Sequence, residues 1–115
     1  MSLTLITLLK RRAGLSREDF VAYYEARHRR IGEQVLAGYV TRYVRRHLTP
    51  LDGNEHECDA DAVMEIDFPD RPTMEAFFAY AGSPDIAATI AEDEEKLFDR
   101  SRIRSFTVED FTSEL

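Results

Sequence analysis

An α+β fold, in which helices cover one face of a four-stranded antiparallel sheet, is the architecture that the sequence predicts. Two observations lead to it. The 115 residues, with 43% hydrophobic and 32% charged side chains, match the length and composition of one globular domain over residues 1–115. The apolar pattern also changes repeatedly between the periods of a strand and of a helix, in the order β-α-β-β-α-β.

The first half of the chain is expected to form a strand and a long helix. Residues 3–11 are short, almost all apolar and rich in Leu, Thr and Ile, which is typical of a strand buried on both faces. Ser16 is a suitable N-cap for a helix over residues 17–36, with Asp19 in its first turn. Gly38 is the expected stop of this helix.

The remaining elements follow in order. β-branched and aromatic residues predict a second strand, and after a polar loop an alternating pattern predicts a third. Two consecutive helical segments follow, with a kink near Gly82 and Pro84, and a fourth strand ends the order. The expected strands are residues 39–48, 62–68 and 102–111, and the expected helical segments are residues 71–82 and 83–99.

This order is that of the split βαβ, ferredoxin-like arrangement. In that arrangement the helices lie on one sheet face and leave the other face open. Because the first strand is apolar on both faces, a partner subunit is expected to cover the open face, which predicts a homodimer.

The charge and the cysteine content limit the possible partners and the possible cellular compartment. The net charge of −7 disfavours nucleic acid and anionic membranes, although residues 1–50 carry +6 and residues 51–115 carry −13. The single cysteine, Cys58, excludes an intramolecular disulfide and favours a reducing, cytoplasmic compartment. No stretch approaches the ~20 apolar residues of a membrane helix, and the N-terminus lacks the pattern of a secretory signal.

Several stretches together resemble the EthD family of the dimeric α+β barrel superfamily. They are "LLKRRAGLSREDFVAYYEARH", "YVTRYVRRH", "DAVMEIDF" and "AEDEEKLFDRSRIRSFTVED". The resemblance implies a ferredoxin-like homodimer with a pocket between helices and sheet. The chain departs from the family pattern after the histidine, where Arg29, Arg30 and Ile31 replace the usual Ala-Pro-Leu. It also departs at Met64 and Asp67, which stand where small and aromatic residues are common.

The first helix carries the leading catalytic candidate, His28. On a helical wheel His28 falls between Val21 and Val35, inside the apolar arc that also holds Tyr24. A core histidine satisfied by a neighbouring polar group is an equally good interpretation of the spacing. His28 also matches the histidine that marks the resembled family, and imidazole groups suit acid/base work near neutral pH.

An acid on the last helix is expected to accompany His28. Glu94 falls inside the apolar arc of that helix and Asp93 at its edge, and the pattern does not choose between them. Either carboxylate could orient His28 if the two helices lie side by side. A surface ion pair with an arginine is the competing interpretation.

Further residues are candidates for binding a substrate. Tyr43 and His47 share one face of the second strand, and Glu65 points either into the pocket or into the dimer interface. The remaining candidates, on the first helix, are Tyr23, Tyr24 and Arg27. The pair His56 and Cys58 lacks the additional ligands of a metal site, and no cofactor motif is present, so neither a metal nor a cofactor is expected.

These observations favour a small cofactor-free enzyme. It would act as a lyase, cyclase or isomerase by acid/base chemistry on a small aromatic or polyketide-like molecule, a class that the family resemblance implies. One alternative is a non-catalytic binding or accessory protein of a degradation pathway. Another is a cofactor-free monooxygenase or a haem-handling relative. Fold alone does not separate these functions.

Overall fold

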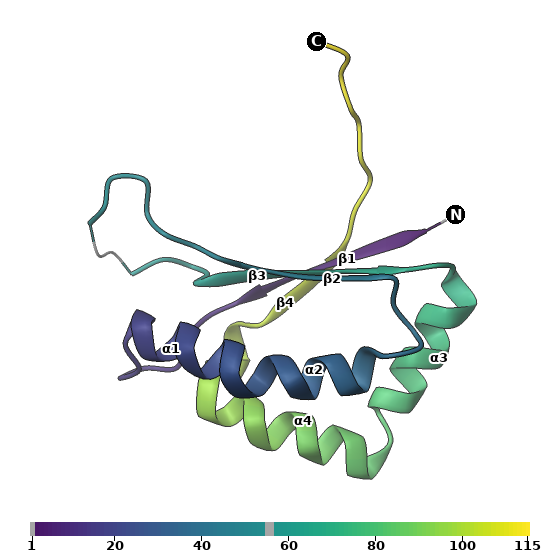
Figure 1. Cartoon of the computed structure of the whole chain (residues 1–115), viewed down its shortest axis with the longest axis horizontal. Helices are drawn as coiled ribbons and strands as arrows, with labels where there is room; N and C mark the ends of the chain where they lie inside the picture. The colour runs from purple at the N-terminus through teal and green to yellow at the C-terminus, as the bar shows by residue number, and fades with distance from the viewer. Residues whose placement is uncertain (1, 55–56) are drawn as a thin grey trace.

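The computed structural model describes residues 2–54 and 57–115. Figure 1 shows one sheet with all the helices on one of its faces. The strands are β1 (Leu3–Leu9), β2 (Arg42–His47), β3 (Ala62–Phe68) and β4 (Arg104–Thr107). The helices are α1 (Arg17–Tyr23), the π-helical turn η1 (Tyr24–His28), α2 (Arg29–Leu36), α3 (Arg71–Ala81), α4 (Pro84–Leu97) and the 3-10 turn η2 (Arg100–Arg102).

The strands form one antiparallel sheet in the order β2-β3-β1-β4. The order β-α-β-β-α-β with this pairing confirms the predicted α+β, ferredoxin-like fold. β1 lies inside the sheet, and β2 and β4 form its two edges. No helix in the described residues is both long enough and apolar enough to cross a bilayer.

The predicted first helix begins where expected but is not a continuous α-helix. The Ser16 hydroxyl accepts a hydrogen bond from the backbone N–H of Asp19 at 3.1 Å, which confirms the N-cap. The α-helical pattern then widens into η1 over Tyr24–His28 and resumes in α2. The helix ends at Leu36, and Gly38 follows with a φ of +86°, a conformation that favours glycine.

Three strands are shorter than predicted. β1 ends at Leu9 instead of residue 11, and β2 covers Arg42–His47 instead of residues 39–48. The fourth strand extends only over Arg104–Thr107, whereas residues 102–111 were expected. Its ladder with β1 ends where Thr107 pairs with Leu5, and the chain then leaves the sheet. Residues 108–111 therefore pair with no strand of the part of the chain that the structure describes.

The two helices of the second half meet near the predicted kink. The Asp70 carboxylate caps α3 by accepting from the Thr73 N–H at 2.8 Å. α3 ends at Ala81, and α4 begins with Pro84 in its first turn, where a missing N–H costs nothing. α4 then runs beside η1 and α2 beneath the sheet (Figure 1).

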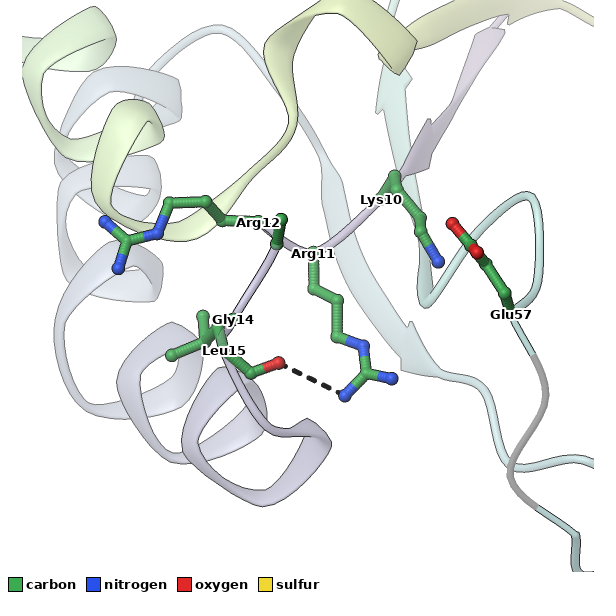
Figure 2. A pocket seen from close by; sticks show the side chains of 7 residues that line it. Lys10, Arg11, Arg12, Gly14, Leu15 and Glu57 are labelled. Carbon is green, nitrogen blue, oxygen red and sulfur yellow. Dashed lines mark hydrogen bonds between the residues drawn. The ribbon is translucent and has the colours of Figure 1, made fainter.

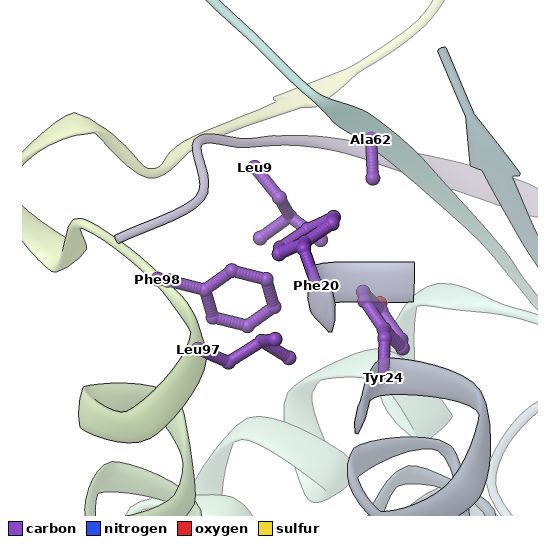
Figure 3. Packing of buried hydrophobic residues seen from close by; sticks show 6 residues of the cluster. All are labelled: Leu9, Phe20, Tyr24, Ala62, Leu97 and Phe98. Carbon is purple, nitrogen blue, oxygen red and sulfur yellow. The ribbon is translucent and has the colours of Figure 1, made fainter. Parts of the chain in front are cut away.

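A tightly packed apolar cluster fixes the first helix and α4 against the sheet (Figure 3). Its fully buried members include Phe20 and Tyr24 from the first helix and Leu97 from α4. The cluster also contains Leu9, Ala62 and Phe98. Phe20, Tyr24 and Phe98 contact one another edge to face, with ring centroids 5.7–5.9 Å apart. This packing holds η1 and the C-terminal end of α4 together.

The sheet face away from the helices is not covered by any element of the described chain (Figure 1). The pairing register places Ile6, Glu65 and Phe106 side by side on this face. Ile6 and Leu8 of β1 therefore lie on the open face, whereas Leu5 and Leu9 face the helices. β1 thus has apolar residues on both faces, as the sequence indicated.

Candidate functional site

A pocket of about 230 Å³ lies between the helices and the sheet. Its walls are mainly apolar, with residues such as Leu5, Ile66, Val35 and Ile90. Six polar side chains also line it, namely Thr7, Tyr24, His28, Tyr43, Glu94 and Ser105. A mainly apolar cavity with a few convergent polar groups is the usual form of a small-molecule site.

The π-helical turn brings His28 to this pocket. π-helical turns are rare and are frequently found at functional sites. His28 is the last residue of η1, and only 12% of its side chain is exposed. Its ring packs edge-on against Tyr24 and Phe98, with centroids 5.3 and 5.2 Å away, so its orientation is fixed by the aromatic cluster.

Asp93 of α4 is the hydrogen-bond partner of His28. Its Oδ2 atom lies 2.7 Å from the Nδ1 atom of His28, and its other oxygen accepts a hydrogen bond from the Tyr23 hydroxyl at 2.5 Å. Asp93 is 6% exposed. This hydrogen bond is the main reason why the pKa of Tyr23 is raised to about 12, since the phenol proton is held by the carboxylate.

The hydrogen bond to Asp93 fixes the tautomer of neutral His28. An ionised carboxylate can only accept, so Nδ1 carries the proton and Nε2 keeps its lone pair. In the described part of the chain, Nε2 has no hydrogen-bond partner. Neutral His28, which lines the pocket, therefore has an unprotonated Nε2 and a buried carboxylate bonded to Nδ1.

Glu94 lines the pocket beside this pair. Burial raises the pKa of its carboxyl group above the usual range. Arg100, whose Nε lies 3.5 Å from Oε1 of Glu94, opposes that rise, as His28 also does, and the neighbouring Asp93 adds to it. The helix thus gives its two adjacent acids different surroundings: Asp93 bonds His28, and Glu94 faces the cavity.

Two tyrosines form another side of the pocket. Tyr24 is fully buried, and its hydroxyl forms no hydrogen bond with any described residue. Burial raises the pKa of Tyr24 and that of its neighbour Tyr43. The Tyr43 hydroxyl lies over Gly32, where a Cβ atom would be only 2.8 Å away. Gly32 therefore provides the space in which Tyr43 reaches α2.

His47 lies behind the pocket and is not part of its lining. Its ring packs edge-on against Tyr24 at 5.2 Å, and its Nε2 atom lies 2.8 Å from Oε2 of Glu25. Arg45 donates two hydrogen bonds to the same carboxylate, at 2.8 and 3.0 Å. Chiefly because of Arg45, and although burial opposes it, the pKa of Glu25 falls to about 2. The sequence patterns did not predict this cluster of Glu25, Arg45 and His47.

Besides His47, the structure places three more predicted substrate-binding residues outside the pocket lining. Arg27 is exposed. Glu65 lies on the open sheet face, where it pairs with Arg42 at 3.2 Å and Arg46 at 2.6 Å. Tyr23 acts from behind the lining, through its hydrogen bond to Asp93.

A second hollow, of about 370 Å³, lies at the end of β1 and carries three basic residues, Lys10, Arg11 and Arg12 (Figure 2). Asp61 holds two of them, because its carboxylate lies 3.4 Å from both the Lys10 Nζ and the Arg11 Nε. Lys10 also donates to the Cys58 carbonyl, and Arg11 to the carbonyl of Leu15. Internal acceptors therefore already occupy most of its cationic groups.

The comparison with known proteins identifies the family. The EthD domain matches residues 12–101, and the chain belongs to the EthD family. No curated protein matches the chain. His56, one of the two residues considered for a metal, lies outside the described residues, and Cys58 is a free cysteine.

Solved structures show the same fold at low sequence identity. An ethyl tert-butyl ether d (EthD) family protein from Bacillus halodurans is 13% identical, covering 96% of this chain and 100% of that one, with a TM-score of 0.66. A dimeric protein of unknown function with a ferredoxin-like fold, from Bacteroides fragilis, is 14% identical over 95% and 96%, with a TM-score of 0.62. HapK from Hahella chejuensis is 13% identical over 100% and 97%, with a TM-score of 0.62.

Proposed function

We propose that the protein is a cofactor-free enzyme in which His28 moves a proton to and from a small molecule held in the pocket between helices and sheet. The reaction class is that of a lyase, cyclase or isomerase. One observation carries the proposal: His28 lines the pocket and forms a short hydrogen bond to the buried Asp93 through Nδ1, which leaves Nε2 without a partner among the described residues. A histidine oriented by a carboxylate in this way has the geometry that general-base catalysis requires.

The proton transfer would involve three side chains, of which only His28 carries the proton. Nε2 of His28 takes a proton from an acidic C–H or O–H group of the ligand, and the resulting imidazolium is stabilised by Asp93. Tyr23 holds Asp93 through the other carboxylate oxygen. The proton then returns from His28 to another atom of the ligand, so the enzyme ends in its starting state.

Glu94 would act on the other side of the reaction. Because burial raises its pKa, Glu94 keeps its proton to higher pH than an exposed glutamate. In the protonated form it can donate a hydrogen bond to a carbonyl oxygen that gains negative charge when His28 removes a proton. The different surroundings of Asp93 and Glu94 thus suit two different roles.

The pocket supports a compact and largely apolar substrate. Its volume of about 230 Å³ is below the ~300–1,000 Å³ of sites for drug-sized ligands, which favours a molecule of one or two rings. The aromatic lining from Tyr24, Tyr43 and Phe98 suits a flat ring. An aromatic or polyketide-like ketone, as the family resemblance implies, meets both conditions.

The proposal can be tested without knowledge of the natural substrate. We would incubate the protein in D₂O with a panel of aromatic methyl ketones and 1,3-diketones and follow the exchange of their acidic C–H protons by NMR. The wild-type protein is expected to accelerate exchange of at least one compound, and His28→Gln to lose roughly 10²–10⁴-fold of that rate. Arg30→Gln, at an exposed position on the same helical segment, is the matched control.

Two outcomes decide between catalysis and binding alone. Equal exchange rates with wild-type protein and His28→Gln would contradict acid/base catalysis by His28. A compound that binds the pocket, seen as shifted resonances of lining residues, but exchanges at the buffer rate would favour the alternative of a binding or accessory protein.

We also propose that two copies of the chain pair through the open sheet face. The dimeric state of the Bacteroides fragilis relative supports this, as do the apolar residues that β1 and β4 present on that face. Phe106 is 50% exposed there. Light scattering at micromolar concentration is expected to give the mass of a dimer, and a monomer would contradict the proposal.

A further inference from the structure

The hydroxyl group of Tyr24 is a buried donor that the described chain leaves unused. Tyr24 lines the pocket, its side chain is completely buried, and its hydroxyl oxygen has no hydrogen-bond partner among the described residues. A buried hydroxyl group without a partner has given up its hydrogen bonds to water, which destabilises the folded state. A bound ligand that supplies the missing partner would account for such a group in a native structure.

The ring of Tyr24 is held in one position, so its hydroxyl oxygen cannot move towards another partner. Four aromatic rings pack edge-on against it, with centroids 5.2–5.9 Å away, namely those of Phe20, His28, His47 and Phe98. Because buried side chains are close-packed in defined rotamers, these contacts preorganise the hydroxyl group. A ligand that bonds it therefore loses little affinity to ordering of the tyrosine.

The surroundings of this hydroxyl group belong to the pocket. Its neighbour Tyr43 is also a lining residue, as is Gly32, over which the Tyr43 hydroxyl lies. Burial is the main reason why the pKa of Tyr24 is raised, so at neutral pH the side chain is a neutral phenol with an O–H group to donate. Tyr24, Tyr43 and Gly32 form what we call the tyrosine side of the pocket.

Glu94, the donor proposed above for the ligand carbonyl, lies in different surroundings. After burial, three groups act on the pKa of the Tyr24 hydroxyl, namely Tyr43, Arg45 and Glu25. After burial, three groups also act on the pKa of Glu94, namely Arg100, His28 and Asp93. The two sets share no member. His28 links the two places, because its ring contacts that of Tyr24 and its charge acts on Glu94.

We propose that the Tyr24 hydroxyl pairs with a second, unreacting oxygen of the ligand, while Glu94 binds the carbonyl oxygen beside the reacting carbon. The substrate class is then a ring with two separate oxygens, such as an aryl ketone that carries a ring hydroxyl group. This inference rests on the proposed function of the pocket, but it concerns recognition of the ligand and not the proton transfer. A site with a buried polar group rejects an analogue that lacks the partner, because the group is then left unpaired.

Two pairs of matched ligands measure this recognition by NMR titration. The compounds para-hydroxyacetophenone and para-methylacetophenone are nearly equal in size, but only the first has a second oxygen; the meta isomers move that oxygen around the ring. In at least one pair the wild-type protein is expected to bind the hydroxy compound roughly tenfold more tightly or better. Tyr24→Phe is expected to reduce this preference to about threefold or less, and to bind the methyl compound within about twofold of the wild type. Tyr80→Phe, which removes a hydroxyl group outside the pocket lining, is the matched control and is expected to keep the full preference.

Two results would overturn the role of Tyr24: a wild-type protein without a preference in either pair, or a preference that survives in Tyr24→Phe. Both would leave the proposed catalysis by His28 standing, since the proton-exchange rates test that separately. A preference that depends on Tyr24, in a protein that accelerates no exchange, would instead contradict the catalysis and support the recognition.

The stability of the ligand-free protein separates recognition from a structural role. Tyr24→Phe removes no hydrogen bond of the described chain, so its Tm is expected to equal or exceed that of the wild type. Tyr80→Phe is again the reference. A Tm for Tyr24→Phe that is lower than those of both the wild type and Tyr80→Phe would show that the hydroxyl already has a partner in the free protein, and would contradict the proposal.

Discussion

The Nδ1 atom of His28 lies 2.7 Å from the Oδ2 atom of Asp93, although 65 positions separate the two residues in the sequence. The first comes from a π-helical turn and the second from α4. Asp93 is almost fully buried, and a buried carboxylate is stable only with partners that donate to it. His28 and Tyr23 are the two donors, so the geometry of the pair is fixed from both sides.

Asp93→Asn should reduce the proton-exchange activity by roughly 10²-fold or more, because the amide no longer stabilises the imidazolium and can impose the other tautomer on His28. Glu92→Gln removes an exposed acid from the same helix and should leave the rate unchanged. NMR exchange rates for the two variants make the comparison. Equal activity of Asp93→Asn and wild-type protein would exclude the pair from the reaction.

Tyr23→Phe should lower the free energy of unfolding by about 1.5 kcal/mol at neutral pH, the lower end for a hydrogen bond to a charged group. The pKa of Tyr23 is about 12 in the folded state and about 10 in the unfolded chain, so the folded state binds this proton more tightly. The wild type should therefore lose stability as the pH rises from about 10 to about 12. Tyr23→Phe should show a shallower loss over that range in thermal melts. Identical slopes would mean that this hydrogen bond does not form in solution.

Glu94→Gln should stabilise the protein at pH 7. The pKa of Glu94 is raised in the folded state, so ionisation costs stability as the pH rises above the ordinary value of 4.5. The glutamine variant avoids that cost, and its Tm should exceed that of the wild type at pH 7 but match it near pH 3. Glu95→Gln, at the exposed neighbouring position, should not shift the Tm in this pH-dependent way. A Tm that falls at pH 7 would show that the contact with Arg100 outweighs burial.

Glu25→Gln should destabilise the protein at neutral pH, because Arg45 and His47 lose their carboxylate partner. The pKa of Glu25 is about 2 when folded against an ordinary 4.5, so its contribution is present above about pH 4.5 and is lost as the pH falls towards 2. The difference in Tm between the variant and the wild type should shrink over that range. A difference that stays constant down to pH 2 would attribute the effect to packing rather than charge.

The sequence predicted much of this site because helical periodicity and apolar arcs are local properties. His28 and Tyr24 face inward as the wheel indicated, and an acid of the last helix does contact His28. The wheel could not choose Asp93 over Glu94, because that choice depends on where η1 lies relative to α4. It could not show the π-helical turn either, because the apolar pattern of residues 17–36 is that of one continuous helix.

Other features were outside the reach of sequence reasoning for a similar reason. Alternation along β3 puts Glu65 opposite Met64, but only the position of the helices shows that Glu65 is on the open face. The cluster of Glu25, Arg45 and His47 joins a helix to a strand 20 residues away. Alternation along β2 puts Arg45 and His47 on the same face, but it does not show that Glu25 of the helix lies between their side chains. The end of β4 at Thr107 depends on where the chain leaves β1.

The tautomer of neutral His28 decides whether this residue can act as a base, and it can be measured without a substrate. Two-dimensional ¹⁵N–¹H spectra of the imidazole groups distinguish a proton on Nδ1 from one on Nε2, and His28→Gln assigns the signal among the three histidines. Neutral His28 is expected to carry its proton on Nδ1, bonded to Asp93, with Nε2 unprotonated. A proton on Nε2 in the neutral protein would contradict it, because His28 would then offer the pocket a donor instead of a base.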